Sequence, residues 1–160
     1  MFSVDYSHIF QNFPPQLATF LIAMVPISEL RASIPIAIKI YELPVWSAYL
    51  WSVLGNLVPM ILIVLILAPV TDFLSRNIKL FQKFFEWLFR HTRHRGEKKF
   101  EKWGEFAVFI LTATPIPLLG GWTGPLAAFV FNIKLKKSMP LIILGCMTAG
   151  VIVTGLTIWF

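Results

Sequence analysis

Cysteine and charge are both scarce in this chain. Its single cysteine, Cys146, excludes a disulfide within the chain and is typical of a small core residue. Only 14% of the residues are charged and 57% are hydrophobic, so 160 residues supply too little polar surface to enclose a soluble core. Residues 1–16 contain no lysine or arginine, which excludes the basic region of a secretory signal, and we expect them to be retained. The composition predicts an integral membrane protein.

The residue patterns of catalytic, metal and nucleic-acid sites are also missing. No nucleophile stands with a base and no Gly-rich phosphate loop follows a strand, so we do not expect an enzyme. His91 and His94 could share a helix face, but no further ligand completes a metal set, and we expect no cofactor. The formal net charge of +6 is concentrated in one segment, which disfavours nucleic-acid binding.

Four apolar segments run along the chain, over residues 17–41, 44–69, 103–133 and 139–160. The second and fourth are uninterrupted and exceed the roughly 20 residues that a helix needs to cross a hydrocarbon core, so they predict transmembrane helices. Prolines and glycines divide the first and third near their middles, and half of such a segment reaches only about halfway through the core. We expect both to be re-entrant hairpins whose tips line a wet cavity or pack in protein.

Basic residues set the predicted orientation. The linker over residues 70–103 holds nine of the fourteen Lys and Arg residues, and the positive-inside rule assigns it to the cytoplasm. Lys134, Lys136 and Lys137 rejoin that side only if the third apolar segment turns back as a hairpin. Both chain termini then lie outside. Apolar residues recur in the linker at helical spacing opposite basic ones, which predicts an interfacial amphipathic helix in contact with anionic lipid.

This topology makes residues 1–160 a single multi-pass domain of the cell membrane, built from two inverted repeats. Repeat 1 covers about 15–69 and repeat 2 about 104–160, each a re-entrant helical hairpin followed by one transmembrane helix, with the linker between them. Gly55 and Gly145 each follow a proline by twenty residues, which is a weak sequence sign of the repeat.

So few membrane elements give little protein to shield polar hairpin tips from lipid. We therefore expect a homo-oligomer, most simply a dimer. Gly145, Ala149 and Gly150 form a small-residue face that could pack closely against a hairpin or against a second copy.

The first tip carries the leading site, a carboxylate and a guanidinium two residues apart in the sequence SELRASIP over residues 28–35. Ionisable groups at membrane depth cost several kcal/mol unless they face a partner or a wet cavity, so Glu29 and Arg31 indicate function. An anion could bind between Arg31 and the helix start there, with Glu29 as counter-ion or proton carrier. The alternative is structural: Glu29 caps the helix and its pairing with Arg31 holds the tip together.

The second tip has no ionisable group, but its glycines permit close backbone approach to a ligand. Trp122 offers a broad face for a large apolar or cationic ligand, and plain packing explains it equally well. The candidate site residues of this tip are Pro117, Gly120, Gly121, Trp122 and Gly124.

Three motifs carry a resemblance to a known family. They are E-L-R followed by I-P over residues 29–35, G-N-x-x-P over 55–59 and P-x-P-x-x-G-x-W-x-G over 115–124. With them the chain resembles the small multidrug export protein family over about residues 24–155. That family is similar in architecture to the DedA-like superfamily, which has paired re-entrant hairpins and includes proposed carriers of polyprenyl-phosphate lipids. The resemblance implies membrane transport and adds Pro35 and Asn56 to the candidate site.

The second tip departs from the family pattern. Leu118 and Leu119 precede the glycines, where family members often carry P-G-T-G before the tryptophan, so Thr123 is the candidate for a hydroxyl ligand.

Three functions remain open. A transporter would move a small or amphipathic substrate through a midplane site between the tips, with Glu29 protonation as one means of coupling. A flippase would bind the headgroup of a polyprenyl-phosphate or other anionic lipid at Arg31. A membrane scaffold would need neither charge for its activity.

Overall fold

The computed structural model describes residues 13–26, 28–77, 83, 105–115, 122–130 and 133–160. Within these residues the chain forms six helices and no strands, so the predicted all-helical fold is confirmed. The helices are α2 (Pro15–Met24), α3 (Glu29–Lys39), α4 (Val45–Asn77), a helix over residues 105–113, α6 (Thr123–Val130) and α7 (Leu135–Trp159).

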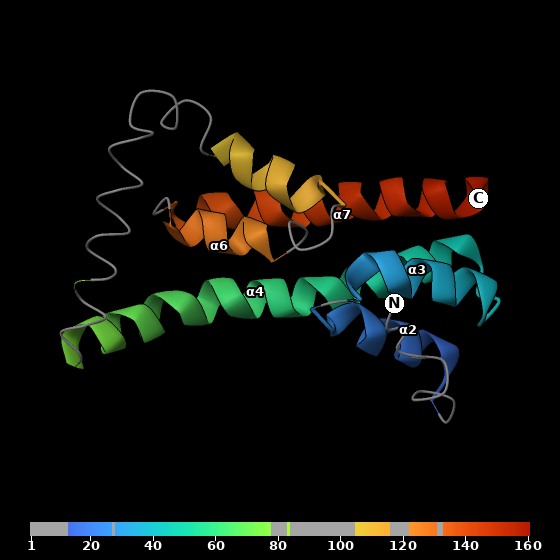
Figure 1. The fold of residues 1–160 in the computed structure, drawn as a ribbon, viewed down its shortest axis with the longest axis horizontal. Coiled ribbons are helices and arrows are strands. Elements are labelled where there is room, and N and C mark those ends of the chain that lie inside the picture. The colour runs from blue at the N-terminus through green and yellow to red at the C-terminus, as the bar shows by residue number, and fades with distance from the viewer. Residues whose placement is uncertain (1–12, 27, 78–82, 84–104, 116–121, 131–132) are drawn as a thin grey trace.

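The two long helices, α4 and α7, run in opposite directions along the long axis of the molecule and pack against each other (Figure 1). Val45–Leu67 and Leu135–Trp159 are long and apolar enough to cross a membrane, as the sequence predicted for the second and fourth apolar segments. Both helices leave large apolar side chains exposed, among them Leu65 on α4 and Val151 on α7. Such surfaces suit contact with lipid tails.

The first apolar segment is divided into two short helices, α2 and α3. The break follows α2 at Val25, whose N–H donates to the carbonyl of Ile22, and the Ser28 hydroxyl donates to the same carbonyl at 2.7 Å. Pro26 stands inside the break, where its missing N–H prevents a continuous helix. Pro35, which the sequence predicted to bound the same interruption, lies inside α3. There it removes a single donor, and the neighbouring turns keep their hydrogen bonds.

The third apolar segment is also divided, into the 105–113 helix and α6. Figure 1 shows this pair over the half of the molecule where α7 begins, whereas α2 and α3 lie at the other end. Residues 116–121, between the two helices, lie outside the described residues, as does most of the predicted linker over 70–103. Residues 70–77 continue α4, so the beginning of that linker is helical.

Two glycines allow the long helices to approach the short ones closely. A β-carbon on Gly55 of α4 would collide with the carbonyl oxygen of Phe20 in α2. A β-carbon on Gly145 of α7 would lie 2.6 Å from Cβ of Thr112 in the 105–113 helix. Gly150 meets Tyr49 of α4 in the same way. The small-residue face of α7 therefore packs against the helices of its own chain.

The buried core joins residues from both halves of the molecule. Ile34, Met60, Val108 and Ile142 are fully buried and belong to one apolar cluster, and Cys146 lies in it with no solvent exposure. The interpretation of Cys146 as a small core residue is confirmed. This core fixes the positions of α3, α4, α7 and the 105–113 helix relative to one another.

Candidate functional site

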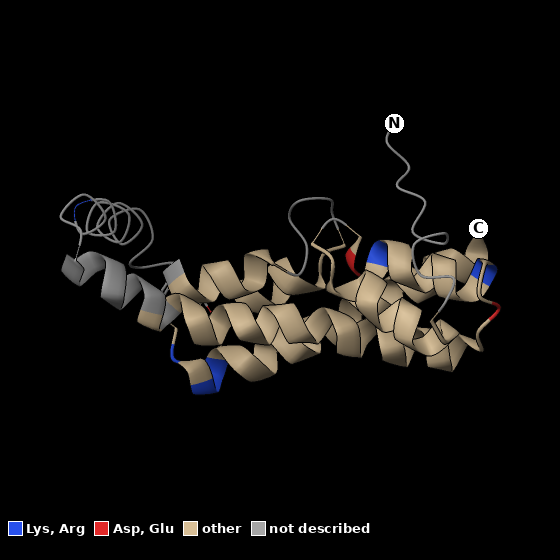
Figure 2. Cartoon of the chain, turned by 90° about the horizontal axis from the view of Figure 1, so that it is seen from below, with Lys and Arg blue, Asp and Glu red and all other residues tan. Residues whose placement is uncertain are grey.

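Charged side chains gather toward the ends of the bundle. Figure 2 shows basic residues where α7 begins, and a second charged group where α3 ends. The start of α3, with Glu29 and Arg31, lies between these two ends near the middle of the molecule. Here, in the described bundle, oppositely charged side chains are mostly shielded from solvent, whereas the side chains of the Glu105–Lys137 pair are exposed.

Glu29 and Arg31 form an ion pair, with Nη2 of Arg31 donating to Oε2 of Glu29 at 2.9 Å. Their side chains are 7% and 23% exposed. Residues two apart do not face each other on a regular helix, and Glu29 is pulled out of helical geometry by its positive φ of 45°. Left-handed backbone costs a non-glycine residue about 1–3 kcal/mol, so the fold maintains this conformation against local strain.

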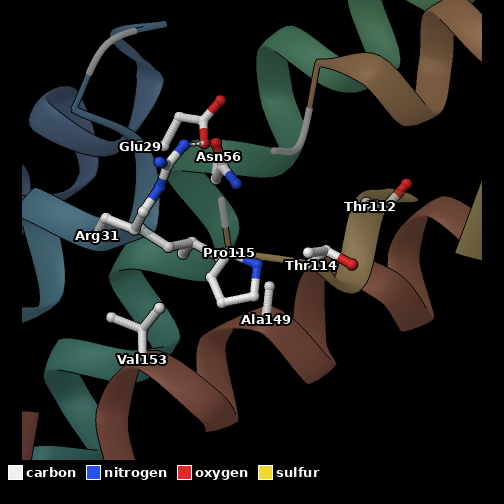
Figure 3. Close-up of a pocket in the computed structure, with 9 residues that line it drawn as sticks. Glu29, Arg31, Asn56, Thr112, Thr114, Pro115, Ala149 and Val153 are labelled. Carbon is white, nitrogen blue, oxygen red and sulfur yellow. Dashed lines mark hydrogen bonds and ion pairs between the residues drawn. The ribbon is translucent and has the colours of Figure 1, made fainter. Parts of the chain in front are cut away.

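A small cavity adjoins the ion pair, shown in Figure 3. It is lined from α3, α4, α7 and the chain around the end of the 105–113 helix, so both divided segments contribute to it. The space open to a water-sized molecule is about 10 Å³, which is room for about one water. The lining residues are Glu29, Leu30, Arg31, Asn56, Thr112, Thr114, Pro115, Ala149 and Val153.

Asn56, which the family resemblance added to the candidate site, lines the cavity. It is 2% exposed, and its Nδ2 donates to Sγ of Cys146 at 3.7 Å, a long contact to a weak acceptor. Its Oδ1 is buried with no hydrogen-bond partner in the described part of the chain. A buried amide oxygen in that state is a ready acceptor for a ligand donor or a water.

Two threonines at the end of the 105–113 helix were missed by the sequence reasoning. The hydroxyl of Thr112 donates to the carbonyl of Val108 at 2.7 Å, and that of Thr114 donates to the carbonyl of Ile110 at 2.6 Å. Both protons are therefore used within the helix, and Figure 3 shows both hydroxyl oxygens pointing away from the ion pair. The available signal was the pair of hydroxyl residues directly before Pro115 in an otherwise apolar segment.

The other predicted site residues stand apart from this cavity. Pro35 lies six residues after Glu29 on α3, and neither Trp122, directly before α6, nor Thr123 and Gly124, which begin α6, lines the cavity. Gly124 contacts Thr112, because a β-carbon there would collide with Oγ1 of that threonine. Pro117, Gly120 and Gly121 lie outside the described residues.

The cavity thus combines one carboxylate, one guanidinium and the side-chain amide of Asn56. Over the described ranges no three His, Cys, Asp or Glu side chains lie together as a metal set. The ion pair is electrically neutral while it is closed. A ligand that binds either charge, or a proton on Glu29, would release the other charge in a mostly buried place. Such a release favours rearrangement.

Comparison with known proteins supplies the family. The family model described as "Putative small multi-drug export protein" matches residues 29–152, more than three quarters of the 160 residues. The match begins at Glu29 and includes all the cavity residues except Val153. Neither a curated protein nor a solved structure matches the chain. With two helices able to cross a membrane and this match, the chain is a membrane protein that belongs to the small multi-drug export protein family.

Proposed function

We propose that this protein is a membrane transporter whose substrate passes through a midplane site at the Glu29–Arg31 pair. The observation that carries the proposal is the 2.9 Å ion pair, with side chains 7% and 23% exposed, at a cavity to which both divided segments contribute. Ionisable residues at such depth in membrane proteins mark substrate or ion pathways. The family name suggests export as the direction and drugs as the substrate class.

The proposed architecture is a pair of inverted repeats with re-entrant hairpins, as in the DedA-like superfamily. The opposed directions of α4 and α7, with the short helices at opposite ends of the molecule, support it (Figure 1). Gly55 and Gly145, ninety residues apart, support it further, because each lies on a long helix and contacts the first short helix of its own half. On this topology the linker is cytoplasmic and both termini lie outside.

Transport requires the cavity to open. Its 10 Å³ holds about one water, whereas sites for drug-sized ligands measure about 300–1,000 Å³. The described conformation is therefore closed around the ion pair. Rocking of one half against the other would separate the wall of α3 from that of Thr112 and Thr114 and admit substrate. Protonation of Glu29, or an anion on Arg31, would break the pair and drive that opening.

A lipid flippase is the second candidate. Arg31 is the cation that lines the cavity, and a guanidinium matches phosphate with two parallel hydrogen bonds. A lipid phosphate could bind there while its tail stays against the exposed apolar faces of α4 and α7. Anionic lipid would also gather at the basic linker.

Flux through purified protein in proteoliposomes tests both candidates. One set of vesicles is loaded with the lipophilic cation ethidium, and a second carries a fluorescent polyprenyl phosphate in one leaflet. Glu29→Gln and Arg31→Ala are compared with the native chain. The control variants are Glu105→Gln and Lys137→Ala. Nζ of Lys137 lies 2.6 Å from Oε1 of Glu105 in an exposed ion pair, and neither residue lines the cavity.

We expect the two site variants to reduce one of the fluxes at least tenfold and the control variants to leave it within twofold. Loss of ethidium flux supports small-molecule export, and loss of lipid translocation alone supports the flippase. Native rates for both site variants in both assays would contradict the proposal and leave a scaffold function.

We also propose that the protein works as a homodimer, because two long helices and four short ones shield little of the polar centre from lipid. Gly145 and Gly150 of α7 are occupied within the chain, so they are not free to form the contact. Light scattering of the detergent-solubilised protein measures the protein mass; the mass of a single chain, 18.3 kDa, would contradict this part.

A further inference from the structure

Buried polar atoms without a partner are unevenly distributed in the described part of the chain. Besides Oδ1 of Asn56, they include the hydroxyls of Ser33 on α3, Ser52 on α4 and Thr154 on α7. Ser33 and Ser52 are fully buried and Thr154 is 9% exposed. Each of the three helices that bound the cavity on this side therefore carries one such hydroxyl.

Two of these hydroxyls continue the polar face of the cavity. Ser33 follows the cavity residue Leu30 by three residues on α3, and Ser52 precedes Asn56 by four residues on α4. Residues three or four apart share a helix face about one turn apart. Because α3 and α4 run in opposite directions here, both steps lead toward the same end of the molecule, where α3 ends and α4 begins (Figure 1).

The third helix extends the row in the same direction. Thr154 follows Gly150, which packs against Tyr49 of α4, by four residues on α7, and α7 ends at the same end of the molecule (Figure 1). Beyond these, the hydroxyl of Tyr41, in the connection between α3 and α4, is also buried without a partner in the described residues. α3, α4 and α7 all contact one another, so these groups surround one interior strip.

The opposite half of the described bundle is different. There the buried hydroxyls of Thr112 and Ser138 donate to carbonyls of their own helices at 2.7 and 3.3 Å. On the face of α4, the residue one turn beyond Asn56 in that direction is Met60, which is fully buried and apolar. Beside the start of α6, Nε1 of Trp122 is also buried without a partner in the described residues, but Trp122 does not line the cavity. The unpartnered hydroxyls therefore lie on the side of the cavity toward the end of α3.

Buried hydroxyls in proteins are satisfied by protein groups or by ordered water, and a row of them without protein partners is costly unless water reaches it. We infer that a file of water between α3, α4 and α7 connects the Glu29–Arg31 cavity with the end of the bundle where α3 ends. The path gives the closed site continuous access to one side of the membrane. The role of this water path in transport rests on the proposed function, whereas the presence of the path does not depend on it.

Cysteine reactivity tests the path without any flux measurement. In a Cys146→Ala background, Ser52→Cys and Met60→Cys place a thiol one turn on either side of Asn56 on the same face of α4. Ser33→Cys adds a second position on the path. Thiolates, which form only where water reaches the sulfur, react with 2-aminoethyl methanethiosulfonate, and intact mass spectrometry follows the product.

We expect Ser33→Cys and Ser52→Cys to react at least about tenfold faster than Met60→Cys. The reaction should be fast with reagent added to one face of sealed vesicles and slow from the other. Met60→Cys removes volume and so favours entry of reagent, which makes it a strict control. Equal rates at Ser52 and Met60 would overturn the inference.

Alanine substitutions give a second test, because the expected change in stability differs between a wet and a dry interior. Removing an unpartnered hydroxyl from a dry site stabilises a protein, whereas removing one that binds water does not. We expect Ser33→Ala and Ser52→Ala to leave the unfolding midpoint in detergent unchanged or lower. An increase of about 2 °C or more in both variants would overturn the water file, whatever the flux assays show.

Discussion

The carbonyl oxygen of Phe20 in α2 occupies the position that a β-carbon on Gly55 of α4 would need. This crossing presses the first short helix against the long helix just beside the cavity residue Asn56. A backbone oxygen cannot rotate away as a side chain can, so the closeness of the two helices depends on glycine at this position.

Gly55→Ala is therefore expected to destabilise the protein by about 2 kcal/mol, because the two helices must separate to accept the methyl group. Gly155→Ala on α7 is the control, since a β-carbon there meets nothing within 4 Å. That variant should be neutral or slightly stabilising because alanine favours helix. Unfolding in detergent measures both; similar losses of stability in the two variants would contradict the packing argument.

Glu29 provides a prediction about strain. At a φ of 45°, glycine adopts the backbone freely and alanine does not. We expect Glu29→Gly to be more stable than Glu29→Ala by about 1 kcal/mol, although both lose the ion pair. The difference between their unfolding free energies is the measurement. A more stable alanine variant would show that this residue relaxes to ordinary helical backbone.

Asn56 offers a test that separates binding from packing. Leucine has the branched side-chain outline of asparagine, with larger methyl groups in place of the amide atoms, so Asn56→Leu removes every polar atom from this fully enclosed position and should still give a folded protein. The flux carried by the native chain should fall at least tenfold. Native flux in a stable Asn56→Leu variant would assign this residue to packing alone.

Much of the fold follows from hydropathy, because lipid requires long uninterrupted apolar helices. The segments over 44–69 and 139–160 are for that reason close to the α4 and α7 of the structure. Their ends were less predictable. α4 continues through Pro69 to Asn77, since one lost hydrogen bond does not end a helix whose next turns are intact.

The charged half of the site was also readable, since Glu29 and Arg31 stand out in an apolar segment. Which groups face them was not, because that depends on where the divided segments meet. Thr112 and Thr114 line the cavity, whereas the conspicuous Trp122 does not. A tryptophan's size suggests a ligand face in sequence, but its place is decided by the packing of α6, which no local pattern records.

The length of α4 has a mechanical consequence. Its 33 residues measure about 50 Å, so the helix extends well past a hydrocarbon core of about 30 Å. From Asn56 to the last residue, Asn77, is about 32 Å, and a tilt of about 10° at the cavity would displace the far tip by about 5 Å. A small change in the tilt of α4 at the cavity therefore becomes a movement of several ångströms at the far end of the helix.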